Sequence, residues 1–74
     1  MLKDKRKEKG FSQQKLSDAT GISLRTITHY EQGLRSINGA KLDTLITFAE
    51  TLECKISDIV DDPNLVNKCK KLGI

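Results

Sequence analysis

The stretch from Ser12 to Gly33 most constrains the fold of this chain, because it contains two helical patterns separated by a single turn glycine. Gly21 stands between the patterns, where the backbone needs a positive φ that glycine adopts at little cost. Gly33 follows the second pattern, as a glycine that ends a helix does. The apolar positions that can meet on one side of this corner are Leu16, Ala19, Ile22, Ile27 and Tyr30. The stretch therefore predicts two short helices packed at an angle.

Each of the two patterns begins after a serine, Ser12 or Ser23, whose hydroxyl can accept a hydrogen bond from a free backbone N–H of the first turn. We expect helices over about Gln13–Thr20 and Leu24–Gln32. The second of these has polar side chains on the face opposite its apolar face. Two helices joined by a tight turn, the second with an exposed polar face, form the helix-turn-helix arrangement that fits the major groove of DNA.

The rest of the chain predicts three more helices, over Leu2–Lys9, Lys41–Leu52 and Ser57–Val60. The longest of them has apolar residues at helical spacing, namely Leu42, Leu45, Phe48 and Leu52. The run Asp61, Asp62 and Pro63 then breaks the pattern. We therefore expect a compact all-α fold of five helices, with one helix-turn-helix domain over residues 1–62 and a C-terminal tail over residues 63–74.

The charges of the chain are unevenly placed along it. Residues 1–41 carry nine Lys or Arg against four Asp or Glu, whereas residues 42–62 carry one basic side chain against six acidic ones. This asymmetry predicts a basic face that meets a polyanion and an acidic face that turns away. Charge alone fits a merely solvated surface equally well, and the helix-turn-helix pattern tips the balance toward DNA.

The two cysteines, Cys54 and Cys69, lack the spacing of a metal site, and His29 is the only histidine, so we expect no bound metal and no cofactor. Cys54 falls at an apolar helical position and is expected in the core, whereas Cys69 lies in the tail. The sequence shows no signal peptide and no long apolar stretch, which favours a reduced, cytoplasmic protein without membrane association. It also shows no nucleophile–base motif and no phosphate-binding loop, so we expect neither an enzyme nor a small-molecule site.

One known family shares the spacing of this motif. The matching residues are Gln13, Leu16, Gly21, Ile22, Ile27, Tyr30, Glu31 and Gly33. With them the chain resembles, over about residues 2–60, the lambda-repressor-like helix-turn-helix proteins, which include phage repressors, Cro proteins and xenobiotic-response-element regulators. It departs from their pattern at Ser17, where a buried alanine is usual, and at Lys5, where leucine is common. Its segment between Gly33 and Leu42 is also longer than usual and lacks the common proline.

The resemblance implies that exposed side chains near the start of the second motif helix read bases. The candidates are Leu24, Arg25, Thr28 and His29. Arg25 is the strongest, because its fork can pair with guanine O6 and N7. Thr28 can offer its methyl to thymine or its hydroxyl to a phosphate. Leu24 either touches a thymine methyl or covers the edge of the preceding helix, and His29 either donates to DNA or is simply exposed.

The resemblance also implies phosphate contacts on both sides of this helix. Gln13 opens the first motif helix, where free N–H groups and the helix dipole favour an anion. The candidates on the other side are Gln32, Arg35, Ser36 and Asn38. Arg6 and Glu31 match family positions that form a buried ion pair, which would fix the recognition helix against the body of the domain.

We therefore expect a sequence-specific regulator that binds double-stranded DNA, a repressor of phage or mobile-element type. The alternative is a protein-interaction module with the same fold, such as an antitoxin or an anti-repressor partner. One small helix-turn-helix reads too few base pairs for useful selectivity. We therefore expect a homodimer, at least on DNA, that binds a palindromic operator. The expected self-contact includes Cys54, Ile56, Ile59, Val60, Leu65 and Val66.

Overall fold

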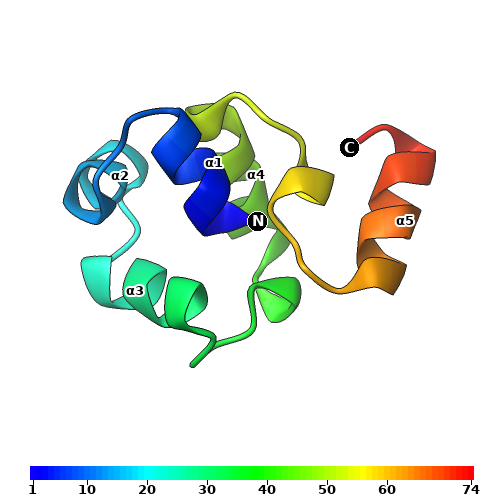
Figure 1. The fold of residues 1–74 in the computed structure, drawn as a ribbon, viewed down its shortest axis with the longest axis horizontal. Coiled ribbons are helices and arrows are strands. Elements are labelled where there is room, and N and C mark those ends of the chain that lie inside the picture. The colour runs from blue at the N-terminus through cyan, green and yellow to red at the C-terminus, as the bar shows by residue number, and fades with distance from the viewer.

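The computed structural model describes all 74 residues, and it contains helices and turns but no strand. The α-helices are α1 (Leu2–Glu8), α2 (Gln13–Thr20), α3 (Leu24–Gln32), α4 (Leu42–Leu52) and α5 (Pro63–Leu72). Two 3-10 turns, η1 (Ile37–Gly39) and η2 (Ile56–Asp58), precede and follow α4. Helices α2 and α3 lie at one end of the molecule and α5 lies at the other (Figure 1). The all-α fold expected from the sequence is confirmed.

The turn between α2 and α3 forms as its local sequence predicts. Ser12 Oγ accepts a hydrogen bond from the Lys15 N–H at 3.0 Å, and Ser23 Oγ accepts one from the Thr26 N–H at 3.1 Å. Gly21 has a φ of 74°, in the left-handed region that disfavours any side chain. Both caps and the turn glycine therefore fix where α2 ends and where α3 begins.

A single apolar core joins the helices. Its fully buried side chains are Phe48, Leu16, Ile27 and Ile59. The ring of Tyr30 on α3 meets that of Phe48 on α4 edge to face, with centroids 6.3 Å apart. Two expected core positions are wrong: Ala19 is exposed, and Leu42 is 64% exposed because it stands at the first position of α4, beyond the end of the core.

The expected fifth helix over Ser57–Val60 is also wrong, because this segment forms only the 3-10 turn η2. The fifth helix instead comes from the expected tail. Asp62 caps it by accepting a hydrogen bond from the Asn64 N–H at 2.9 Å, and Pro63 occupies its first turn. Proline fits the first turn of a helix because the N–H that it lacks has no partner there. The Asp-Pro pair that breaks the preceding pattern therefore starts a new helix.

Helix α5 folds back onto η2 and completes the core. Cys69 on its inner face is buried, and Leu65 and Val66 pack against the core cluster. The Ser57 N–H donates to the Ile74 carbonyl at 3.2 Å, which ties the end of the chain to η2. No helix combines the length and the apolar character needed to cross a membrane.

Candidate nucleic-acid interface

The outer face of α3 presents several of the side chains expected to read DNA. Arg25 is exposed and forms no ion pair with any carboxylate of the protein, and Leu24 is 39% exposed. Thr28 and His29 are half-buried, one turn further along the same face. The structure thus places a free guanidinium, an apolar group and two polar groups on one side of a short helix.

The inner face of α3 is held by a buried ion pair with α1. Arg6 Nε lies 2.7 Å from Glu31 Oε2, and Arg6 Nη2 lies 2.9 Å from Glu31 Oε1. The side chains are only 9% and 2% exposed. Arg6 Nη1 also donates to the Phe11 carbonyl at 2.7 Å, so all three guanidinium nitrogens are used. This bidentate geometry fixes the rotation of α3 about its own axis.

The charge state of Glu31 follows from the same contacts. Burial of the carboxyl raises its pKa, but the hydrogen bonds from Arg6 and Gln13 and the positive charges of Arg6 and Lys3 outweigh burial. The pKa of Glu31 therefore lies below its ordinary value of 4.5, and the group is ionised at neutral pH.

The side-chain amide of Gln13 links α2 to α3 through two hydrogen bonds. Its Nε2 donates to Glu31 Oε1 at 3.1 Å, and its Oε1 accepts a hydrogen bond from Thr28 Oγ1 at 3.3 Å. The side-chain amide expected to bind a phosphate is therefore engaged between α2 and α3. The N-terminus of α2 keeps the backbone N–H groups of Gln13 and Gln14, which point out of the first turn and can still meet an anion.

The segment after α3 brings a second set of basic groups to the same end of the molecule. Arg35 stacks over the Tyr30 ring, with its guanidinium carbon 5.6 Å from the ring centroid. Arg35, Thr26, Lys41 and Thr44 share a shallow hollow of about 360 Å³ between α3 and α4. Lys41, which was not among the residues expected from the sequence, is the N-cap of α4. Its basic charge just before a predicted helix was the signal in the sequence that could have identified it. Gln32 and Ser36 are exposed.

Asn38 does not fit the phosphate-binding role expected for it. Its Nδ2 donates to Asp61 Oδ1 at 2.6 Å, and its Oδ1 accepts from the N–H groups of Asp61 and Asp62 at 2.9 and 3.0 Å. The amide is thus engaged by a pair of acidic residues whose charge repels a phosphate. Asn38 instead joins η1 to the start of α5, and we remove it from the candidate interface.

The residues expected to form the contact between two copies are largely engaged within one chain. Ile56 of η2 and the two residues Ile59 and Val60 that follow η2 are buried in the core of one chain, where α5 packs against η2. Cys54, Leu65 and Val66 are half-buried against the same core. The three buried side chains are therefore not available for a contact between copies, and the three half-buried ones offer only part of their surface.

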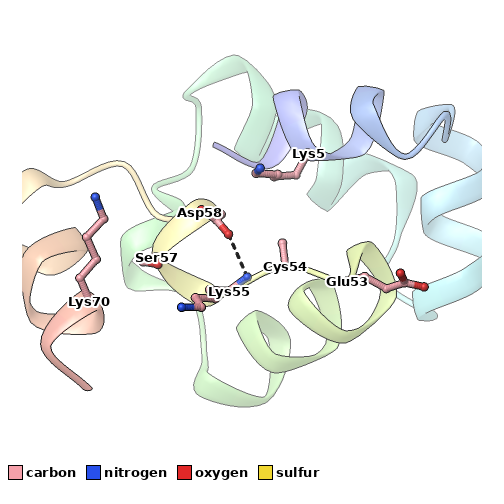
Figure 2. Close-up of a pocket in the computed structure, with 7 residues that line it drawn as sticks. All are labelled: Lys5, Glu53, Cys54, Lys55, Ser57, Asp58 and Lys70. Atoms are coloured by element: carbon pink, nitrogen blue, oxygen red, sulfur yellow. Dashed lines mark hydrogen bonds between the residues drawn. The ribbon is translucent and has the colours of Figure 1, made fainter. Parts of the chain in front are cut away.

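A second hollow lies between α1, η2 and α5, with a volume of about 590 Å³. It is lined by Lys5, Glu53, Cys54, Lys55, Ser57, Asp58 and Lys70 (Figure 2). Asp58 Oδ2 accepts from the Lys55 N–H at 3.0 Å, and the Lys5 ammonium lies 3.0 Å from Glu8 Oε2. None of the lining residues belongs to α2 or α3, so this hollow is separate from the candidate interface.

The fold and the exposed face of α3 together define a small all-α DNA-binding domain of the helix-turn-helix class. The chain matches the model of a helix-turn-helix family over residues 2–59, and it belongs to this family, which is of the lambda-repressor type. It is accordingly a DNA-binding protein of the kind that regulates transcription. Helix α5 lies outside the matched residues. Searches of curated proteins and of solved structures found no match.

Proposed function

We propose that this protein binds a specific site on double-stranded DNA through α3 and represses transcription there. The observation that carries the proposal is the unpaired, exposed Arg25 on a helix whose opposite face is locked by the Arg6–Glu31 pair. A rigidly held guanidinium can present its two donors to guanine O6 and N7 in the major groove. Leu24 lies beside Arg25 and can contact a thymine methyl, and His29 can donate one turn later.

Two sets of groups flank α3 and can hold the DNA backbone. On one side is the N-terminus of α2 at Gln13. On the other side are Arg35 and Lys41, together with Gln32 and Ser36. Such contacts fix the position of α3 on the duplex, and they add affinity without adding base preference.

We further propose that the protein is a cytoplasmic repressor of the phage or mobile-element type. The proposal rests on its kinship with a family that includes phage repressors and Cro proteins. A protein bound across a promoter blocks polymerase by occupying its site, so the domain needs no cofactor for this role.

We also propose that two copies bind a palindromic operator. Each copy has one recognition helix of nine residues, which spans only a few base pairs. A two-fold pair would read half-sites centred about 34–36 Å apart. Such a contact can use the exposed apolar side chains of Ile46 and Ile74, which line one hollow, together with Leu72.

Selection of bound duplexes from a random pool tests the specificity, and sedimentation on the selected duplex tests the stoichiometry. We expect one preferred sequence with inverted symmetry and two proteins per duplex. A pool without a preferred sequence would contradict the DNA-reading role and favour the protein-interaction alternative. One protein on an asymmetric site would contradict only the dimer.

A further inference from the structure

A continuous chain of hydrogen bonds runs from the core to the exposed side of α3. It begins at Arg6, whose Nε lies 2.7 Å from Glu31 Oε2. It continues from Glu31 to Gln13, whose Nε2 lies 3.1 Å from Glu31 Oε1. It ends at Thr28, whose Oγ1 lies 3.3 Å from Gln13 Oε1. The last group is half-buried and sits on the face of α3 that carries Arg25.

The direction of every hydrogen bond in this chain is fixed by its buried end. A guanidinium can only donate and an ionised carboxylate can only accept. The Gln13 atom that faces Glu31 must therefore be the NH₂ group, which turns the amide oxygen toward Thr28. An amide oxygen only accepts, so the single hydroxyl hydrogen of Thr28 must point to Gln13. The Thr28 hydroxyl is left with its lone pairs alone.

We propose that Thr28 is a specificity-determining residue that accepts a hydrogen bond from an exocyclic amino group in the major groove, either adenine N6 or cytosine N4. This inference rests on the DNA-binding role proposed above. Guanine O6 and thymine O4 are acceptors, as are phosphate oxygens. A hydroxyl whose hydrogen is committed to Gln13 has no donor for any of them.

Thr28 therefore discriminates among the bases by whether the base offers a hydrogen-bond donor in the major groove. Adenine and cytosine are accepted because they offer a donor, and guanine and thymine are rejected because they place a keto oxygen against the hydroxyl lone pairs. Gln13 and Glu31 act in this scheme as positioning residues. They touch no base through their side chains, yet they set the polarity of the hydroxyl that does.

The test starts from the duplex selected above and replaces each base pair of one half-site by the other three. Binding constants are measured by fluorescence anisotropy for the wild type, Thr28→Val, Thr28→Ser and Gln13→Leu, after circular dichroism shows that each variant is folded. In the wild type, one position should bind adenine and cytosine about 3- to 10-fold more tightly than guanine and thymine, the range expected for one hydrogen bond.

Thr28→Val keeps the shape of the side chain but lacks the hydroxyl, so the preference at this position should disappear. Thr28→Ser keeps the hydroxyl and should keep the preference. Gln13→Leu releases the hydroxyl hydrogen, so guanine and thymine should become tolerated there while adenine and cytosine still bind. A residue that contacts only phosphate would instead weaken all duplexes alike, without changing any preference.

Two outcomes would overturn the inference while leaving the DNA-reading role intact. One is a Thr28→Val variant whose base preferences equal those of the wild type. The other is a wild type that prefers guanine and thymine at the position that depends on Thr28, since the hydroxyl then donates. A random pool that yields no preferred duplex would overturn the proposed function itself, and the inference with it.

Discussion

Asn38 and Asp61 are joined by reciprocal hydrogen bonds across 23 positions of the sequence. The Asn38 amide donates to the Asp61 carboxylate at 2.6 Å and accepts from the Asp61 N–H at 2.9 Å. It also accepts from the Asp62 N–H at 3.0 Å, one residue before α5 begins. The loop after the recognition helix is thereby held against the element that completes the core.

Asn38→Ala should lower the free energy of unfolding and leave the affinity for DNA nearly unchanged. It removes the acceptor of two backbone N–H groups, and the expected loss is about 0.5–1.5 kcal/mol because these groups are exposed to water. Urea unfolding measures the first effect and titration of the selected duplex measures the second. Asn67→Ala, the same change at an exposed position of α5 outside the proposed interface, is the matched control and should not lower the stability. A loss of affinity without a loss of stability would return Asn38 to the interface.

Arg6→Met should destabilise the domain strongly, because it leaves the Glu31 carboxylate buried without its partner. Breaking a buried pair in this way costs about 3–5 kcal/mol, a large part of the stability of a small domain. Thermal and urea unfolding measure the loss. Lys7→Met, at an exposed position of the same helix without an ion pair, is the control. The double variant Arg6→Met/Glu31→Met should recover part of the loss, and no recovery would mean that packing around Arg6 matters more than the charge pair.

The stability of the protein should fall in acid through Glu31. The pKa of this group is lower in the folded chain than its ordinary value of 4.5, so the unfolded chain takes up the proton first. The stabilisation is fully present above pH 4.5 and is lost as the pH falls through the lowered folded value. Urea unfolding at a series of pH values should show a steeper acid loss for the wild type than for Glu31→Gln. Parallel curves would show that other carboxyls cause the acid loss.

Arg25→Ala should weaken binding to the selected duplex by about 1–3 kcal/mol and relax the preference at one guanine. Arg25→Lys is the sharper comparison, because it keeps the charge but loses the two-pronged fork. Compared with Arg25→Ala, the lysine variant should regain affinity for all duplexes but regain less of the preference for guanine. Anisotropy titrations against the selected duplex and its guanine variants measure both. An alanine variant with unchanged affinity and preference would remove Arg25 from the reading face.

Local sequence was enough to predict the elements whose signals lie within one or two turns. The serine caps of α2 and α3 and the left-handed Gly21 and Gly33 depend only on nearby backbone groups, and each forms as expected. The helical spacing of Leu45, Phe48 and Leu52 likewise predicts the buried face of α4. The ion pair of Arg6 with Glu31 was expected from family resemblance, since no local rule joins residues 25 positions apart.

Only the tertiary structure decided the roles that depend on distant partners. Asn38 looked free to bind a phosphate because Asp61 comes near it only after the chain has folded. Ile56, Ile59 and Val60 looked like surplus apolar surface because the helix that covers them, α5, begins at a proline that also ends the preceding pattern. The sequence by itself determined which segments become helices and which face of each is apolar. The packing determined which polar atoms are already used, because a hydrogen bond between distant residues exists only once the core has brought them together.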